Sequence, residues 1–222
     1  MNKKLQKHIY LLEDDEDLSE ALSMTLEHEK YICHAFHSTL DFFEAIDTSL
    51  DNSTESIETL ILDINLGKES GIEVFNALKN KIKYFAIPII FLTGHGDIYL
   101  AKSTIQNGAF DFLSKPISEQ DLMETVELSM NEALKRKEIK KFLEEWKEKE
   151  QKLTEKESEV MLNICKGNSN KEISEIMGNS IRTIELHRSR IFDKFKVSSA
   201  VELASNSEKF IILVEKYNVI KF

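Results

Sequence analysis

The chain has 222 residues, of which 41% are apolar and 31% are charged. This length predicts one large domain or two small ones, and the apolar fraction excludes a mainly disordered protein. The formal net charge of −10 argues at first against a protein that binds nucleic acid. The charge is uneven, however, because residues 1–120 hold 20 acidic residues and 10 lysines, whereas 180–196 holds five basic and two acidic residues. This asymmetry predicts two domains with different partners, one of which can approach a polyanion.

Five short apolar runs alternate with amphipathic stretches in the first half of the chain. Runs of this length predict buried strands of a parallel sheet that is covered on both faces. The apolar residues between the runs recur at helical spacing, so we predict a doubly wound α/β domain with five parallel strands over residues 1–125. Residues 51–58 are predicted to form a long loop before the third strand. The strands are expected at 8–12, 31–36, 59–63, 88–93 and 110–114.

The second half lacks a strand signal until its C-terminal tail. Apolar residues interleaved with Lys and Glu predict a helical linker over 126–152, which is either a solvated charged helix or a dimer seam. Breaks that contain Ser or Asn divide the following residues into short helices, which predicts an all-α helix-turn-helix domain over 153–222. The tail at 206–222 is predicted either to extend the last helix, with Asn218 as its cap, or to form a strand.

The two cysteines, Cys33 and Cys165, lie far apart among apolar neighbours. A disulfide framework or a zinc site is therefore not expected. The apolar stretch near the N-terminus is too short for a signal sequence, and no segment approaches the roughly 18 apolar residues of a membrane helix. We expect a soluble, cytoplasmic protein.

Polar residues stand at the ends of four of the predicted strands. The acidic run 13–17 follows the first strand, Asp63 ends the third, Thr93 ends the fourth, and Lys115 follows the fifth. Ligands of open parallel sheets bind at this edge, outside the carboxyl ends of the strands. Clustered carboxylates repel one another, and hard oxygen ligands of this kind favour Mg²⁺.

Residues 1–125 resemble the receiver domain of two-component response regulators. The resemblance lies in the LILDINLG context of Asp63, the FLTGHGD run around Thr93 and the DFLSKP run that contains Lys115. It implies a flavodoxin-like fold and transfer of a phosphoryl group from a histidine kinase to Asp63. The sequence departs from the family pattern at Gly67, where many receivers carry proline.

The same resemblance implies a role for each of the other polar residues. Lys115 would place a positive charge at one phosphoryl oxygen, and the Thr93 hydroxyl would donate to another. Phe112 would be the aromatic residue that turns inward when Thr93 shifts toward the phosphoryl group. A cis peptide bond is also implied between Lys115 and Pro116.

The resemblance further implies a Mg²⁺ ion held by Glu13, Asp14, Asp63 and the backbone carbonyl of Asn65. The acidic run allows two registers, in which the pair of ligands is either Glu13 with Asp14 or Asp14 with Asp15. The family's inward-facing leucines in the next helix favour the first register.

An aspartyl-phosphate hydrolase of the haloacid-dehalogenase type is the main enzyme alternative. The reaction of such a hydrolase also starts from an aspartate that follows an apolar strand. It needs a second aspartate two residues later as its general acid. This chain has Asn65 at that position. We therefore expect that the protein is not an enzyme.

The run from Leu153 to Val197 resembles the LuxR/FixJ (NarL) type of helix-turn-helix domain along its whole length. Within it, Ile184, Ile191 and Phe195 fall on one side of a helical wheel and predict the buried stripe of a recognition helix. The resemblance therefore implies that this helix enters the major groove of DNA.

The opposite side of this helix holds the residues expected at DNA. The resemblance places Glu185, Leu186 and Ser189 toward base edges, where Glu can accept from cytosine and Leu can contact a thymine methyl group. Basic side chains nearby are expected at phosphates, which position the helix without reading the sequence. The other predicted DNA-binding residues are Lys171, Arg182, Thr183, Arg188, Arg190 and Lys194.

These features together predict a response regulator that controls transcription after phosphorylation at Asp63. Its expected partners are a sensor histidine kinase, promoter DNA and, when phosphorylated, a second copy of the chain, with no membrane partner. Pairing is expected to be needed for tight binding, because the acidic half repels phosphates. The alternative is a DNA-binding regulator whose receiver is not phosphorylated and signals through protein contacts alone.

Overall fold

The computed structural model describes residues 5–50, 56–79, 81–94, 103–217 and 219. The chain divides into two compact units, the first containing the residues up to Lys140 together with Val219, and the second containing the residues from Lys141 to Tyr217. In chain order the elements are β1 (Gln6–Leu12), α1 (Glu16–His28), β2 (Ile32–Phe36), α2 (Thr39–Leu50), β3 (Ser56–Asp63), β4 (Asn65–Leu66), β5 (Glu69–Ser70), α3 (Gly71–Leu78), η1 (Ile82–Tyr84), β6 (Ile89–Thr93), β7 (Asp111–Ser114), α5 (Glu119–Gln151), α6 (Glu155–Cys165), α7 (Asn170–Met177), α8 (Ile181–Phe195) and α9 (Ala200–Tyr217).

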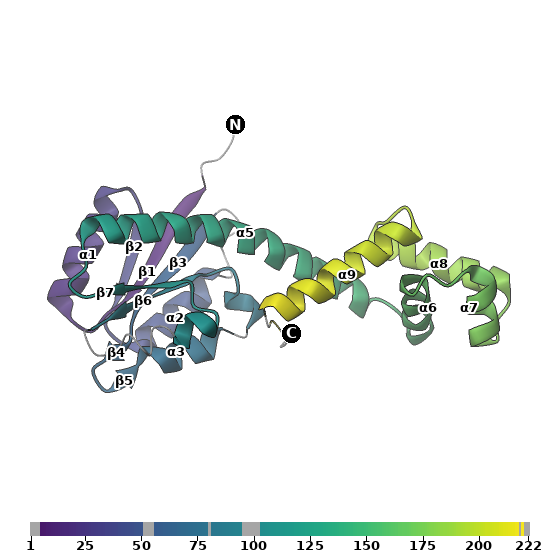
Figure 1. Cartoon of the computed structure of the whole chain (residues 1–222), viewed down its shortest axis with the longest axis horizontal. Coiled ribbons are helices and arrows are strands. Elements are labelled where there is room, and N and C mark those ends of the chain that lie inside the picture. The colour runs from purple at the N-terminus through teal and green to yellow at the C-terminus, as the bar shows by residue number, and fades with distance from the viewer. Residues whose placement is uncertain (1–4, 51–55, 80, 95–102, 218, 220–222) are drawn as a thin grey trace. The chain divides into compact units, whose positions relative to one another are not determined.

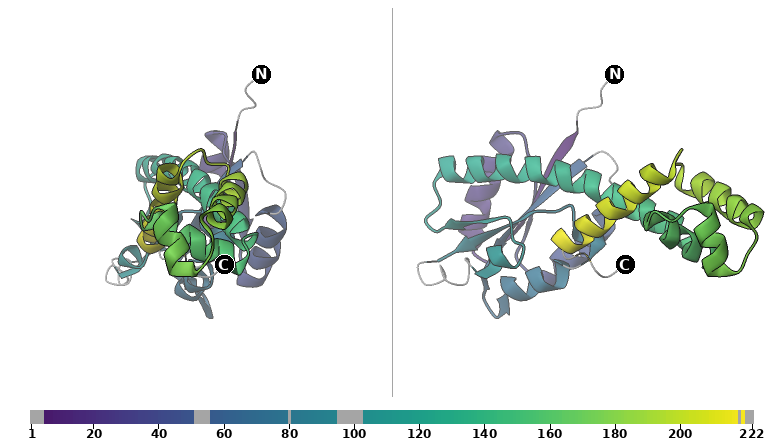
Figure 2. Two further views of the ribbon diagram at one scale, coloured as in Figure 1. Left: turned by 90° about the vertical axis from the view of Figure 1, so that its right-hand side faces the viewer. Right: turned by 45° about the vertical axis from the view of Figure 1, so that its right-hand side comes forward.

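The first unit is built on a parallel five-stranded sheet with the order β2-β1-β3-β6-β7. Helices α1 and α5 cover one face of this sheet, and α2 and α3 cover the other, as both Figure 1 and Figure 2 show. The predicted doubly wound α/β fold is therefore confirmed. The strand order changes direction between β1 and β3, so the carboxyl ends of these two strands flank the point where such sheets bind ligands.

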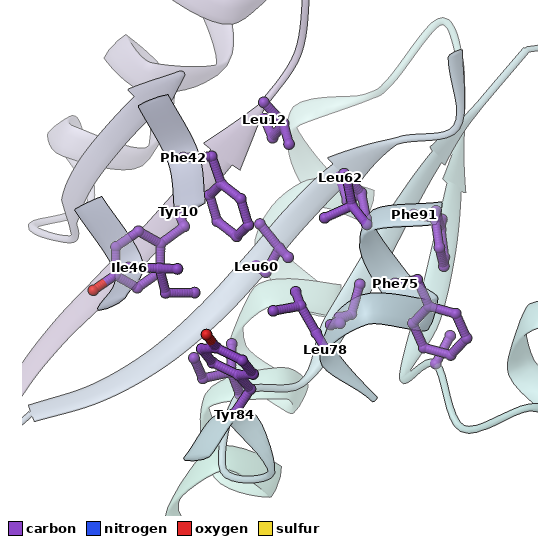
Figure 3. Close-up of a cluster of buried hydrophobic side chains, with 14 of the residues drawn as sticks. Tyr10, Leu12, Phe42, Ile46, Leu60, Leu62, Phe75, Leu78, Tyr84 and Phe91 are labelled. Carbon is purple, nitrogen blue, oxygen red and sulfur yellow. The ribbon is translucent and has the colours of Figure 1, made fainter. Parts of the chain in front are cut away.

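Alternate residues of each strand enter two separate apolar cores. On β1, Ile9 and Leu11 face α1 and α5, whereas Tyr10 and Leu12 face α2 and α3. All eight residues of β3 are buried, because this strand lies in the middle of the sheet and both of its faces are covered. Figure 3 shows the core beneath α2 and α3, with Tyr10, Leu12, Phe42, Ile46, Leu60, Leu62, Phe75, Leu78, Tyr84 and Phe91 labelled.

The start of β3 differs from the sequence prediction. Residues 56–58 were expected in a loop, but they form the first part of β3 and pair with β1, with Ser56 opposite Gln6 and Glu58 opposite His8. The strand prediction missed these residues because the polar side chains of Ser56 and Glu58 interrupt the apolar run. The Ser56 hydroxyl donates to the Glu58 carboxylate, so these two buried polar groups satisfy each other inside the sheet.

The helix expected after the fourth strand lies largely outside the described residues. Residues 103–106, between β6 and β7, are helical. The strands β1, β2, β6 and β7 begin and end within two residues of their predicted limits, whereas the short strands β4 and β5 were not predicted.

Helix α5 contributes to the cores of both units. Val126 and Met130 are buried against the sheet of the first unit. Phe142 and Trp146 pack into the core of the second unit. The segment 126–152, expected to be a linker between domains, is therefore helical as far as Gln151 but divides its apolar residues between the two cores.

The second unit packs α6, α7, α8, α9 and the last part of α5 around one apolar core. The predicted all-α domain is confirmed, and the tail that allowed two readings is helical to Tyr217. Leu203 and Phe210, seven residues apart on α9, explain this outcome because both reach the core at helical spacing. Asn218, the expected cap, lies outside the described residues. Among the helices that the structure describes, none is both long and apolar enough to cross a bilayer.

Trp146 joins the helices of the second unit. Its ring is 4% exposed and lies edge-on to Phe195, with 4.6 Å between the ring centroids, and stacks on Phe210 at 5.7 Å.

We expect Trp146→Ala to lower the free energy of unfolding of this unit by about 3–5 kcal/mol and to leave the first unit unchanged, as measured by scanning calorimetry of the full chain. Leu162→Ala, at a residue that is 61% exposed on α6, is the control and should change stability by less than about 0.5 kcal/mol. Equal effects of the two substitutions would contradict this account of the core.

Candidate functional site

Charged side chains converge at the carboxyl ends of β1 and β3. Glu13 follows β1 and Asp63 ends β3, and their exposed fractions are only 0% and 4%. Lys115 follows β7, and its Nζ lies 2.7 Å from Glu13 Oε2 and 2.7 Å from Asp63 Oδ2. The backbone N–H of Asn65 donates to Asp63 Oδ1 at 3.2 Å. Both oxygens of the Asp63 carboxylate are therefore held by donors.

Three carboxylates in this cluster could hold a cation. Ligand oxygens of Glu13, Asp14 and Asp63 all lie within 4.8 Å of one another, and Asp14 is exposed while the other two are buried. Hard oxygen ligands with one side open to water suit Mg²⁺, which keeps several waters when it binds. Asp15 has a different role, since its Oδ1 accepts the N–H of Leu18 at 3.1 Å and caps α1. The structure thus brings Glu13 and Asp14, and not Asp15, to Asp63.

The electrostatics of the cluster depend on burial. The pKa of Glu13 is raised to about 7, mainly by burial, with a further contribution from the negative charge of Asp63, while Lys115 partly opposes the rise. For Lys115, burial alone would lower the pKa, but its hydrogen bonds to Asp63 and Glu13 raise it overall. Lys115 is therefore positively charged at neutral pH, between two acids.

The backbone after Asp63 depends on two glycines. Gly71 begins α3 and donates its N–H to the Ile64 carbonyl at 2.9 Å, and a Cβ at this position would lie 1.9 Å from the Asp63 carbonyl oxygen. Only glycine permits this close approach. Gly67 has a φ of +64° in the turn between β4 and β5, and the proline that many receivers carry here cannot adopt that angle. Sequence reasoning overlooked Gly71, although a glycine at the start of a helix is a signal of close packing.

Thr93 and Phe112 lie on the neighbouring strands β6 and β7. Thr93 is fully buried, and its hydroxyl donates to the Leu113 carbonyl at 3.4 Å. Phe112 is half-buried and packs against the core beneath α2 and α3. The peptide bond between Lys115 and Pro116 is cis, as the resemblance implies.

In the second unit, α8 has the two faces predicted for a recognition helix. Ile184, Ile191 and Phe195 are buried, which confirms the expected apolar stripe. Thr183 is half-buried near the start of α8, and its hydroxyl shares a hydrogen bond of 2.8 Å with the Ser180 hydroxyl. The exposed residues among those predicted at DNA are Lys171, Arg182, Glu185, Leu186, Ser189 and Arg190.

Two basic residues of α8 differ from the exposed group. The Arg188 guanidinium lies over the Phe192 ring, 5.5 Å from its centroid. Lys194 is turned inward, with Nζ 2.7 Å from Glu157 Oε2 and 2.7 Å from the Lys152 carbonyl oxygen. Its geometry does not favour the phosphate contact that we expected from the sequence, because its ammonium group is already engaged within the domain.

The two units match two sequence families in the same order. Residues 9–127 match the response regulator receiver domain, and residues 151–206 match the bacterial regulatory proteins of the luxR family. The chain belongs to the response regulators. It is a transcriptional regulator of a two-component system, with a receiver and a LuxR-type DNA-binding domain.

Relatives of known name support this membership over most of their length. The chain is 31% identical to the transcriptional regulatory protein TdiR of Thauera aromatica, covering 88% of this chain and 82% of TdiR. It is 32% identical to the tetrathionate response regulatory protein TtrR of Salmonella typhimurium, covering 90% and 92% of the two chains. The solved structure of response regulator StyR has a TM-score of 0.66 at 28% identity, covering 92% of this chain and 99% of StyR.

The raised pKa of Glu13 has a consequence for stability. The pKa is about 7 in the folded protein, against an ordinary value of 4.5, so the folded state binds this proton more tightly than the unfolded chain does. The resulting contribution to stability is full below the unfolded pKa and is lost as the pH rises through the folded pKa. We expect the free energy of unfolding of the wild type to fall relative to that of Glu13→Gln between about pH 5 and about pH 7.5 in EDTA, as measured by urea denaturation. Parallel curves would contradict this expectation, and Glu20→Gln, at an exposed residue of α1, is the control.

Proposed function

We propose that Asp63 is the phosphoacceptor of this response regulator and that its phosphorylation controls DNA binding by the second unit. One observation carries the proposal: the buried Asp63 carboxylate lies between the Lys115 ammonium and the Asn65 N–H, beside two further acids. Phosphoryl transfer asks a protein mainly for positioning and charge neutralisation, and this arrangement offers both.

The chemistry of the transfer assigns a task to each residue. An oxygen of Asp63 attacks the phosphorus of a kinase phosphohistidine, and the O–P bond forms while the N–P bond breaks. The bonding electrons return to the imidazole nitrogen, which takes up a proton. Lys115 stays beside the acceptor and neutralises a phosphoryl oxygen. The Thr93 hydroxyl turns from the Leu113 carbonyl to another phosphoryl oxygen, and Phe112 moves inward.

Mg²⁺ fits the donor set of the acidic cluster. Its proposed ligands are Glu13, Asp14, Asp63 and the backbone carbonyl of Asn65, and the exposed position of Asp14 leaves room for water. When bound, the ion supplies positive charge to the oxygens of the acceptor and of the phosphoryl group. Lys115 compensates part of the negative charge of Glu13 and Asp63, which explains why these two acids can be buried together.

The second unit is proposed to read promoter DNA with α8. Glu185, Leu186 and Ser189 are exposed on this helix and are assigned to base edges. The segment 180–196 carries a local excess of basic residues over acidic ones, which suits contact with a phosphate backbone. The residues assigned to phosphates and to the positioning of α8 on them are Lys171, Arg182, Thr183, Arg188 and Arg190.

We further propose that the phosphorylated protein binds DNA as a homodimer in the cytoplasm, where its kinase partner transfers the phosphoryl group. A pocket on the second unit supports a dimer contact, because exposed apolar residues of α9 line it, among them Val201, Ile211 and Ile212. Two half-sites in the operator follow from such a dimer.

The phosphoacceptor can be tested with acetyl phosphate and Mg²⁺. We expect the wild type to gain one phosphoryl group by intact mass and Asp63→Asn to gain none, because the amide is not a nucleophile for this reaction. Asp17→Asn, at an exposed residue of α1, should be labelled like the wild type. Labelling of Asp63→Asn would refute the assignment. A wild type that binds DNA but is never labelled, and does not respond to beryllofluoride, would favour the regulator that signals through protein contacts alone.

The phosphate contacts can be tested by the salt dependence of DNA binding. Arg190 is exposed on α8, so Arg190→Ala should weaken binding to all sequences and reduce the slope of log K against log salt concentration by about 1. Fluorescence anisotropy with one duplex at several salt concentrations measures this slope. Lys216→Ala, in the last turn of α9, should leave the slope unchanged. An unaltered slope for Arg190→Ala would remove this residue from the phosphate contacts.

A further inference from the structure

A buried carboxylate lies at the start of α6, close to the end of the recognition helix. Glu157 is only 2% exposed. Its Oε2 accepts from the Thr154 backbone N–H at 2.8 Å, from the Thr154 hydroxyl at 3.0 Å and from Lys194 Nζ at 2.7 Å. These donors fully occupy one carboxylate oxygen inside the domain.

Lys194 connects the last turn of α8 to the segment between α5 and α6. Besides Glu157, its ammonium donates to the carbonyl oxygen of Lys152 at 2.7 Å. The two partners lie 37 and 42 residues away along the chain. A single side chain therefore fixes the end of the recognition helix to the beginning of its own domain.

The pair is maintained in its charged form. Burial alone would raise the pKa of Glu157, but the hydrogen bonds from Lys194 and Thr154 lower it to about 2. Removing one partner would leave the other as an uncompensated charge in a largely buried position, which is costly. A DNA phosphate that drew Lys194 away from this pair would leave the Glu157 carboxylate without its cation.

The apolar contacts of α8 do not fix its position in the way that this pair does. Ile184, Ile191 and Phe195 pack along one side, but apolar contacts lack direction and tolerate small rotations. Hydrogen-bonded charges have a preferred direction and distance. A helix with side chains is about 10–12 Å across, so a rotation of about 20° moves a side-chain tip by roughly 2 Å. Such a shift would remove a side chain from hydrogen-bond distance of a base edge.

We propose that Glu157 and Lys194 are positioning residues for sequence recognition. They fix the rotation of α8 about its axis and its position along that axis, so that its exposed face meets base edges. They contribute to discrimination between DNA sequences and not to the attraction of phosphates. The inference rests on the proposed DNA-reading function of α8.

The test uses the full chain and two duplexes. One duplex is selected by the wild type from a random library, and the other is a scrambled version with the same composition. We expect Lys194→Met, which keeps the apolar stem, to lower affinity for the selected duplex roughly tenfold, the scale of one lost base contact. Affinity for the scrambled duplex should change less than about twofold, and the salt slope should stay unchanged.

Further variants separate positioning from a general loss of structure. Glu157→Gln keeps an acceptor for Thr154 and should reproduce the loss of discrimination, at a temperature where calorimetry shows the second unit folded. Because the two residues act together, the double variant should lose little more than either single variant. Lys194→Arg keeps the charge and should retain most of the discrimination.

Arg190→Ala is the comparison for a phosphate contact, since it should weaken both duplexes and lower the slope. The same behaviour in Lys194→Met would overturn the proposal and make Lys194 a phosphate ligand. Unchanged discrimination in both Lys194→Met and Glu157→Gln would also overturn it. If the wild type selects no duplex at all, the proposed DNA-reading function fails first, and this inference fails with it.

Discussion

The first unit depends on the ammonium group of Lys115, which bridges two buried acids. Lys115 lies between Glu13 and Asp63, and without it two carboxylates would be buried side by side with uncompensated charge. The bridge also joins the ends of three strands, because these residues lie at β1, β3 and β7. In the proposed function this ion pair also prepares the acceptor, because the ammonium that stabilises the two acids would neutralise an oxygen of the incoming phosphoryl group.

The parallel sheet makes this arrangement possible. Its strands end at one edge in matching register, with Asp63 opposite Leu92 on β6 and Thr93 opposite Ser114 on β7. The apolar cores on both faces hold the strands, and the charged residues of the candidate site collect at the carboxyl edge. The second unit uses a related solution, in which the Glu157 and Lys194 pair ties α8 to α6 around an apolar core. In each unit, an ion pair with a buried carboxylate joins elements to which the proposed function assigns a role.

Sequence reasoning identified most of the fold because buried strands and amphipathic helices have distinct periodicities. The pattern predicted Asp63, Thr93 and Lys115 at the carboxyl edge of the sheet, since each of them ends or follows an apolar run. It assigned the first residues of β3 to a loop, because Ser56 and Glu58 are polar and satisfy each other only when folded. The sequence pattern of α5 predicted a helix but did not tell which core each of its apolar residues enters.

The sequence by itself determined the two domains, the strand and helix types and the identity of the residues that can perform chemistry, because these follow from local periodicity and residue type. The tertiary structure alone decided which of these residues meet. It placed Asp15 at a helix cap and Glu13 at Lys115, and it turned Lys194 inward to Glu157 although its spacing allowed an exposed position. The physical reason is that a buried charge requires a partner, and that partner can lie more than a hundred residues away, as Glu13 lies from Lys115.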